Sequence, residues 1–273
     1  IIFGTTEIKP VRNILPLLPR INMLGIVHDA LKLDSSGTFK YIYSFRIKKY
    51  FVFGDFIKNN LKRSIKQKLF AFYPCYFPIL SVNEAPVKIE GEKWIIVPGV
   101  VKGERKDYIP LLKKVLAVGM PGNIKIIFLG KLYKEELEIV DLVQKINHHE
   151  QNIKTFDEFL TYDLFHSYLQ KADFILPLLK ISEDFFYGNT KISGAFNLAY
   201  SYRLPMLLPD SYKKNTDLTP FSVYYKSMDE LYQLLLSINS NRMNTMEIKN
   251  SYRASKKFDF NTMADEIASF INE

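Results

Sequence analysis

Cysteine is nearly absent from this chain, and so are the residue clusters that hold metals. Cys75 is the single cysteine among 273 residues, so no disulfide can form within the chain, and a reducing compartment is the default expectation. No Cys–His cluster with zinc spacing occurs. His148 and His149 are adjacent, so on a helix they diverge by about 100° and do not readily share one ion. We therefore predict no metal site.

Several sequence signatures are also missing. No apolar run approaches the roughly 20 residues that cross a bilayer. The chain has no P-loop, no Gly-x-Gly-x-x-Gly fingerprint and no Gly-x-Ser-x-Gly elbow, which argues against sites built on those motifs. The N-terminus lacks both a signal-peptide pattern and a methionine, and Ile1–Gly4 is typical of the end of a buried strand. We expect a cytoplasmic protein whose natural chain begins earlier, so that its N-terminal domain is incomplete.

Positive charge is in excess: the formal net charge is +8, and basic residues are densest over Lys58–Lys68. The plain interpretation of this run is a solvated helix or loop face. The functional interpretations are anionic small substrates, an anionic membrane surface and nucleic acid. A peripheral membrane contact rests on apolar residues that recur at helical spacing beside the lysines, namely Leu61, Ile65, Leu69 and Phe72. We expect no nucleic-acid partner, because no recognised binding module accompanies the charge.

Apolar segments of strand length alternate with helical patterns nearly throughout the chain. Strands are predicted at residues 25–27, 49–53, 94–97, 124–129, 173–176, 205–208 and 222–225. Helices are predicted from Asp55, over 107–119, 134–146 and 162–171, and from Ser193 and Met228. Prolines within residues 74–90 indicate an interdomain linker. The alternation predicts parallel sheets covered on both faces, with ligands at the carboxyl ends of the strands.

The loop at residues 98–107 joins a predicted strand to a predicted helix and carries basic residues. Gly99 permits the close approach of a backbone or a ligand. Arg105 and Lys106 stand just before the helix and can reach a diphosphate, Arg105 as a bidentate fork and Lys106 as a mobile charge. The alternative is an exposed basic turn without a ligand.

A second loop of this kind lies at residues 189–194, where a polar, glycine-containing turn opens a helix. The start of a helix offers unpaired N–H groups and the positive end of a dipole, both of which suit a phosphate. Lys191 adds a cation and Ser193 a hydroxyl, and the segment through Gly194 supplies backbone N–H groups to the same ligand. The alternative is a structural helix with serine as a routine cap. Two cationic strand-to-helix loops in one domain favour an anion site more than either loop alone.

His28 and Asp29 follow a predicted strand in the earlier part of the chain. A histidine at such a position can bond a substrate hydroxyl or orient a reacting group. The alternative is a partly buried structural histidine, with Asp29 as a helix cap.

Together these segments resemble the GT-B glycosyltransferases, most of all the family-4, or group 1, enzymes of surface-polysaccharide synthesis. The resemblance is carried by the strand and basic loop at 95–106, the strand at 126–130, the helix and strand at 165–176, the Ser-Gly loop and helix at 193–205, and the strand and His at 25–29. It covers nearly the whole chain in order. It implies an α/β fold of two Rossmann-like domains (GT-B), of which the N-terminal domain is incomplete.

The same resemblance implies a domain division. Residues 1–80 would form a partial acceptor-side domain, residues 81–258 the nucleotide-sugar-binding domain, and residues 259–273 a C-terminal helix packing back on the first domain. The implied activity is that of a hexosyltransferase-like, metal-independent, retaining enzyme. It would move a sugar from a nucleotide-sugar donor to a saccharide or lipid-linked acceptor, with no cofactor beyond that substrate.

The implied site residues fall into two groups. His28 and Asp29 would serve catalysis, and the donor would be bound by Gly99, Arg105, Lys106, Lys191, Ser193 and Gly194. One departure is Leu198, which stands where many members carry a glutamate that contacts the donor ribose, and Glu183 is a substitute candidate. This departure keeps open a non-catalytic GT-B-like module that binds nucleotide or polysaccharide. An epimerase of the same fold is a third hypothesis.

Overall fold

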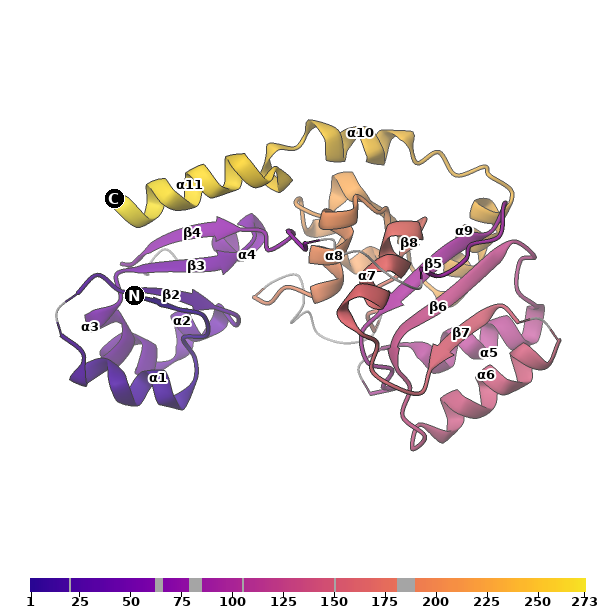
Figure 1. The fold of residues 1–273 in the computed structure, drawn as a ribbon, viewed down its shortest axis with the longest axis horizontal. Helices are drawn as coiled ribbons and strands as arrows, with labels where there is room; N and C mark the ends of the chain where they lie inside the picture. The colour runs from indigo at the N-terminus through magenta and orange to yellow at the C-terminus, as the bar shows by residue number, and fades with distance from the viewer. Residues whose placement is uncertain (20, 62–65, 79–84, 105, 150, 181–189) are drawn as a thin grey trace.

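The computed structural model describes residues 1–273 except 20, 62–65, 79–84, 105, 150 and 181–189. Its described strands form two sheets, one of four strands and one of six. The first sheet is built from the earlier part of the chain and the second from the later part, and Figure 1 shows them next to one another along the long axis. We call the parts around these sheets the first lobe and the second lobe.

The first sheet has the order β1-β2-β3-β4, and all neighbouring strands are parallel. Its strands are β1 (Ile2–Phe3), β2 (Leu24–Val27), β3 (Lys49–Phe53) and β4 (Lys68–Phe72). The connections contain α1 (Lys9–Ile14), the 3-10 turn η1 (Leu15–Leu17), α2 (Leu31–Ser35), the π-helical turn η2 (Phe39–Tyr43), α3 (Ser44–Arg46) and α4 (Asp55–Asn60). Because β3 is an interior strand buried on both faces, its sequence after Lys49 is apolar at every position.

The second sheet is also parallel, with the order β10-β9-β8-β5-β6-β7. Its strands are β5 (Lys93–Pro98), β6 (Ile124–Lys131), β7 (Ile153–Phe156), β8 (Phe174–Ile175), β9 (Met206–Pro209) and β10 (Ser222–Tyr225). The helices are α5 (Tyr108–Val118), α6 (Leu137–His149), α7 (Tyr162–Lys171), α8 (Gly194–Tyr202) and α9 (Met228–Asn239), with 3-10 turns η3 (Asp210–Lys214) and η4 (Thr219–Phe221). The first three strands run outward in one direction and the next three in the other, which is the Rossmann arrangement.

Alternate side chains of the second sheet enter two separate apolar cores. On one face, Ile95 and Val97 of β5 pack with buried residues of α5, α6 and α9. On the other, Trp94 and Ile96 pack with buried residues of α7 and α8 and with Tyr252. Both faces are therefore covered by helices, as the near-continuous apolar strands predict.

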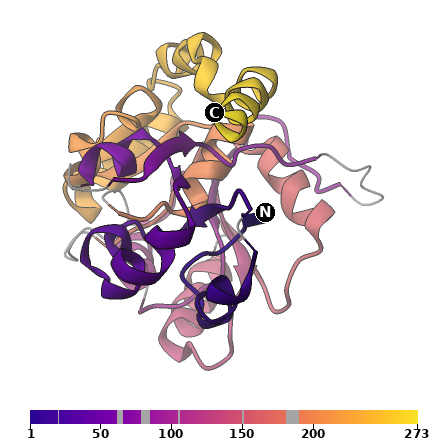
Figure 2. The ribbon, with the colours of Figure 1, turned by 90° about the vertical axis from the view of Figure 1, so that its left-hand side faces the viewer.

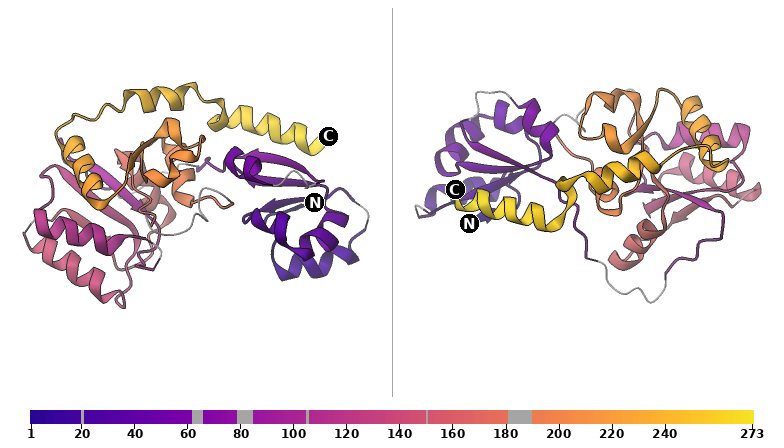
Figure 3. Two further views of the ribbon diagram at one scale, coloured as in Figure 1. Left: turned by 180° about the vertical axis from the view of Figure 1, so that it is seen from behind. Right: turned by 90° about the horizontal axis from the view of Figure 1, so that it is seen from above.

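The C-terminal segment passes from the second lobe to the first. It contains α10 (Met246–Ala254), the 3-10 turn η5 (Lys256–Phe258) and α11 (Phe260–Asn272). In α11, Phe270 packs in one buried cluster with Leu24 and Phe51 of the first sheet. Lys49 Nζ donates to the carbonyl oxygen of Phe270 at 2.9 Å. Figure 3 shows this segment running along both lobes, and Figure 2 shows both chain ends on one side of the molecule.

Most predicted elements are present, but the basic segment after α4 differs from expectation. α4 ends at Asn60, and Leu69 and Phe72, which were expected on the apolar face of a helix, lie on strand β4. The helical spacing that supported a membrane-surface contact is therefore wrong for these two residues, and Ile65 lies outside the described residues. Both side chains are half-buried, because Leu69 packs against the core of the first lobe and Phe72 against the α11 side of the sheet.

Two further differences concern the edges of the sheets. Strand β7 was not predicted, since Lys154 and Thr155 interrupt its short apolar pattern. Ile2 forms a strand as expected but is 51% exposed, because β1 is an edge strand rather than a buried one. Within the described residues, no helix is long and apolar enough to span a membrane.

Candidate functional site

The candidate site begins where the second sheet reverses its strand order, between β5 and β8. The loops that follow these two strands are joined at this edge. Lys106 and Leu179 form an isolated antiparallel bridge, and the N–H of Asp107 donates to the carbonyl oxygen of Leu178 at 3.1 Å. In open parallel sheets, ligands bind in the crevice outside the carboxyl ends at such a reversal. The topology therefore selects the loop between β5 and α5.

Lys106 places a partly enclosed amine at this edge. Its Nζ donates to the carbonyl oxygen of Pro98 and lies 5.8 Å from the centroid of the Tyr108 ring. Burial lowers the pKa of Lys106 to about 8, and no charged neighbour among the described residues offsets that effect. An amine that is desolvated without a counter-ion is stabilised in its charged form when an anion binds beside it.

Gly99 and Gly130 bring two strand ends close together beside Lys106. Gly99 has φ 95°, a backbone conformation that favours glycine. A Cβ atom built on Gly130 would lie 2.3 Å from the carbonyl oxygen of Gly99, so no side chain fits at Gly130. A Cβ atom on Gly99 would lie 3.9 Å from Lys106 Nζ, which shows that Gly99 borders the amine. The prediction that Gly99 serves close approach is consistent with this geometry.

Helix α8 begins with an open turn. Ser193 is its N-cap, and the Ser193 hydroxyl accepts a long hydrogen bond of 3.4 Å from the N–H of Ala195. Gly194 is exposed, and no atom lies within 4 Å of a Cβ built on it. Packing therefore does not explain glycine at this position. Ser193 is therefore a structural cap, and its part in an anion site stays a prediction.

Lys191 and Asp29 connect the two lobes. Lys191 Nζ lies 3.1 Å from Asp29 Oδ2, and the N–H of Ala30 donates to the carbonyl oxygen of Thr190 at 3.0 Å. The structure thus brings together a residue expected to serve catalysis and one expected to bind the donor. Lys191 contacts Asp29 while Lys106 contacts Pro98, so convergence of these cations on one ligand stays a prediction.

His28 lies exposed at the carboxyl end of β2. Its Nε2 is 3.0 Å from the carbonyl oxygen of Gly4, and its ring packs edge-on at 4.8 Å from the Phe53 ring. Since a carbonyl oxygen only accepts, this contact places a proton on Nε2, and in the neutral ring with that tautomer Nδ1 is an acceptor. The ring is thus oriented by the loop after β1, and Nδ1 can accept a hydrogen bond from a ligand hydroxyl.

Glu7 was not predicted as a site residue, although it fixes the backbone at His28 and Asp29. Its Oε1 accepts from the N–H of His28 at 2.5 Å and from the N–H of Asp29 at 2.7 Å. Glu7 Oε2 and Asp29 Oδ1 are buried without a hydrogen-bond partner. The one available signal was a carboxylate in the turn between a short strand and a helix, which by itself is too common to select a residue.

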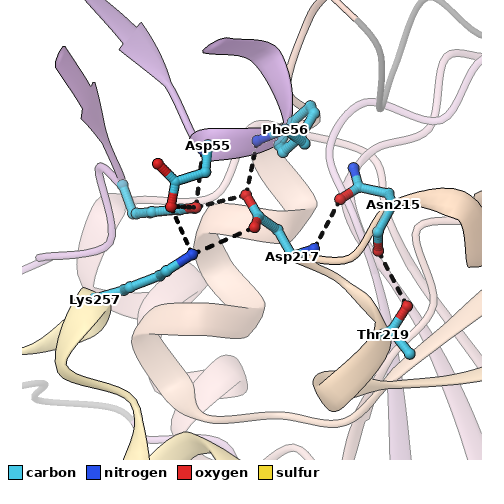
Figure 4. Close-up of polar contacts among 7 residues, drawn as sticks. Asp55, Phe56, Asn215, Asp217, Thr219 and Lys257 are labelled. Atoms are coloured by element: carbon cyan, nitrogen blue, oxygen red, sulfur yellow. Dashed lines mark hydrogen bonds and ion pairs between the residues drawn. The ribbon is translucent and has the colours of Figure 1, made fainter. Parts of the chain in front are cut away.

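A second connection between the lobes, shown in Figure 4, is centred on Asp217, whose side chain is 8% exposed. Its Oδ2 accepts from Tyr73 Oη at 2.6 Å and from the N–H of Phe56 at 2.9 Å. Lys257 Nζ lies 2.6 Å from Asp55 Oδ2 and 3.4 Å from Asp217 Oδ1. We call these five residues the interlobe cluster. It joins the first lobe, the second lobe and the C-terminal segment.

Electrostatics favour the charged form of Lys257 in this cluster. Partial burial lowers the pKa of Lys257, but the hydrogen bond to Asp55 and the charges of Asp217 and Asp55 outweigh it, so the pKa is raised. The cluster therefore keeps its ion pairs at neutral pH.

Some predicted features fall outside the described residues or in the core. Arg105, Glu183 and Asn189 lie outside the described residues. Leu198, noted above as the departure from the resemblance, is buried in the core between α8 and the second sheet. Among the described residues, no group of three or more His, Cys, Asp or Glu side chains is placed to hold a metal ion.

No family model and no curated protein matches this chain. Solved structures match it over most of its length. The HepE protein of Anabaena in complex with UDP is 14% identical, with a TM-score of 0.59, over 93% of this chain and 72% of that one. A UDP-N-acetylglucosamine 2-epimerase is 14% identical (TM-score 0.56; 98% and 70% covered). The sucrose-phosphate synthase of Thermosynechococcus elongatus is 12% identical (TM-score 0.57; 96% and 70% covered). These similarities confirm the predicted α/β fold of GT-B type.

Proposed function

We propose that this protein is a glycosyltransferase that moves a sugar from a nucleotide-sugar donor to a saccharide or lipid-linked acceptor. The observation that carries the proposal is the uncompensated amine of Lys106 beside Gly99, at the strand-order reversal of a Rossmann-type sheet. A second observation is the open start of α8 at Gly194. HepE, whose fold is similar, was solved in complex with UDP, and this supports a nucleotide as the ligand.

In this proposal the leaving group is a nucleoside diphosphate, and positive groups of the second lobe stabilise its developing charge. Lys106 supplies one cation, and Lys191 supplies another after it leaves Asp29. The amides near Ser193 and Gly194 add donors from the start of α8. Arg105 belongs to the same proposed set. With these cations present, the proposed reaction needs no metal ion and no cofactor besides the donor.

The first lobe supplies the groups that face the sugar. His28 contacts the transferred sugar through Nδ1, while Glu7 holds the backbone that presents it. Asp29 stands beside the reacting carbon of that sugar. Its carboxylate is released from the ion pair when Lys191 turns to the diphosphate. We include in the proposal a retaining, hexosyltransferase-like reaction of surface-polysaccharide synthesis. The resemblance to family-4 enzymes supports this part.

The first test measures thermal shifts with UDP and GDP for the protein and for two lysine variants. We expect UDP or GDP to stabilise the wild type, and Lys106→Gln to lose most of that shift. Lys113→Gln is the matched control, because Lys113 lies on the exposed face of α5 and pairs with Glu138, away from the candidate site. Absence of a shift with every nucleotide would contradict the donor site.

The second test measures turnover with a panel of UDP- and GDP-sugars in the presence and absence of acceptors. We expect hydrolysis or transfer, and a loss of up to about tenfold in His28→Ala, because the variant lacks the hydrogen bond from Nδ1 to the sugar, which contributes about 0.5–1.5 kcal/mol. Nucleotide binding without turnover, unaffected by this substitution, would favour the non-catalytic binding module instead.

A second candidate function is sugar epimerisation. It is favoured by the similarity to a UDP-N-acetylglucosamine 2-epimerase over 98% of this chain. An epimerase would isomerise the nucleotide-sugar without an acceptor, whereas a transferase would release nucleoside diphosphate. Analysis of the products by chromatography therefore separates the two.

A further inference from the structure

The first lobe contains a groove at the amino-terminal edge of its sheet, opposite to the edge that carries His28. Its volume is about 700 Å³, within the range of sites that hold small ligands. It is lined by residues of the helical segment from η2 to α3, by the start of β3 and by the residues before β4. Since β3 has five residues, this edge is on the order of 15 Å from the carboxyl edge.

Two exposed aromatic rings form the wall of this groove. Tyr41 is 72% exposed and Phe45 is 73% exposed, and both line the cavity. Arg46 holds the same segment in place by donating to the carbonyl oxygens of Leu18 and Pro19. Large aromatic rings that remain exposed beside a cavity indicate a binding surface rather than a core. Flat aromatic faces suit the apolar face of a sugar ring, although Lys40 Nζ already lies 5.4 Å from the centroid of the Tyr41 ring.

The polar groups of the groove are mostly donors. Lys40, Lys48 and Lys66 line it, together with a single carboxylate residue, Asp34, and Lys48 Nζ also donates to the carbonyl oxygen of Ser44 at 2.7 Å. Tyr50 also lines it but belongs to the buried core of the first lobe, so it forms the floor of the groove rather than a polar contact. A ligand that brings anionic groups to the lysines and sugar rings to the aromatic side chains fits this lining.

A second cavity continues the groove toward the end of α11. It has a volume of about 460 Å³ and shares Phe45 and Lys48 with the first. Arg46 and Lys49 add positive charge there, and Glu273 is the one acidic residue among those that line it. The two cavities therefore form one elongated, basic and aromatic surface.

We propose that this groove binds an acidic saccharide, with its sugar rings on Tyr41 and Phe45 and its carboxylate or sulfate groups on the lysines. The elongated shape suits a chain of several sugars. That the anion is a saccharide rests on the proposed function, since a growing acidic glycan would need a second holding point away from the reacting end. The basic and aromatic lining is a property of the groove itself.

The test measures binding of oligogalacturonate by isothermal titration calorimetry, with an uncharged dextran oligomer of the same length as the comparison. We expect the acidic oligomer to bind at least tenfold more tightly than dextran, and its affinity to fall with added salt. The double variant Tyr41→Ala/Phe45→Ala should lose at least tenfold in affinity. Phe159→Ala is the control, because Phe159 is an exposed aromatic residue of the second lobe.

Equal binding of dextran and oligogalacturonate, or unchanged affinity in the double variant, would overturn the proposal. Binding of the wild type to phosphatidylglycerol vesicles but not to the oligosaccharide would also overturn it, in favour of a membrane contact. The same variants are measured for the thermal shift with UDP, which should be unchanged. A failed nucleotide shift with intact saccharide binding would refute the proposed function alone, so the two outcomes are distinguishable.

Discussion

Removal of the Asp217 carboxylate should weaken the connection between the lobes. Asp217→Ala takes the acceptor away from Tyr73 Oη and from the N–H of Phe56, and it removes the longer pair with Lys257. Hydrogen bonds to a charged group contribute about 1.5–3 kcal/mol each, and a buried donor left without an acceptor adds its desolvation cost. Tyr73 Oη keeps Asp55 Oδ2 at 3.3 Å as an acceptor, and Lys257 keeps its pair with Asp55, so the losses at these two residues are small. We therefore expect a destabilisation at the lower end of the sum for the two lost hydrogen bonds, about 3 kcal/mol.

The assay is urea unfolding followed by two probes. Trp94 is the single tryptophan and lies in the core of the second lobe, so its fluorescence reports on that lobe, while far-UV circular dichroism reports on both. We expect the circular dichroism midpoint of Asp217→Ala to fall and the fluorescence midpoint to move less, because the first lobe loses its support. Asp217→Asn, which keeps the shape and one acceptor oxygen, should lose about half as much.

The control is Asp141→Asn, which removes an exposed pair with Lys145 on the surface of α6. Exposed pairs of this kind contribute about 0.3–0.5 kcal/mol. An effect of Asp217→Ala no larger than that of the control would refute the reasoning. Coincident shifts of both probes would show that the lobes unfold as one unit and that the cluster supports the whole molecule.

Three further predictions concern the site and the C-terminal segment. Burial lowers the pKa of Lys106 to about 8, so most of this amine is neutral at pH 9 in the free protein. The affinity for UDP, measured by calorimetry, should therefore fall up to about tenfold from pH 7 to pH 9. The Lys106→Gln variant should not show this dependence on pH. Gly130→Ala should lower the melting temperature sharply, since its Cβ would meet the Gly99 carbonyl oxygen at 2.3 Å. Gly194→Ala should leave the free energy of unfolding unchanged or raise it by up to about 1 kcal/mol, and it should weaken nucleotide binding. Phe270→Ala should cost about 3–4 kcal/mol in urea unfolding followed by circular dichroism, because it empties the buried contact between α11 and the first sheet.

The interior strands could be predicted from the sequence because burial on both faces makes them continuously apolar. Strands β3 and β5 were found for this reason, and each ends at a glycine or proline. The edge strand β7 has one solvated side and alternates with Lys154, so its pattern is weak. Strand β4 was taken for part of a helix because Leu69 and Phe72 are three residues apart, which places them on one face of a helix. On a short strand the same spacing places them on opposite faces, and both faces of β4 are half-buried.

The position of the candidate site could be predicted in part. Gly99 and Lys106 follow from the rule that loops at the carboxyl ends of parallel strands bind ligands, and the structure places them next to each other. The pairing of Asp29 with Lys191 could not be predicted, because it depends on how the two lobes meet. Glu7 could not be predicted either, since its partners are backbone N–H groups that leave no pattern in the sequence.

The return of the C-terminal segment to the first lobe has a mechanical consequence. The chain crosses between the lobes twice, once between β4 and β5 and once between α10 and α11, as Figure 3 shows. A single tether permits rotation in any direction, whereas two tethers define one axis through both crossing points. Rotation about that axis would first have to break the pair of Lys191 with Asp29 and the interlobe cluster, while a twist would in addition stretch one crossing segment against the other. Any separation of the lobes is therefore expected to follow a single hinge direction.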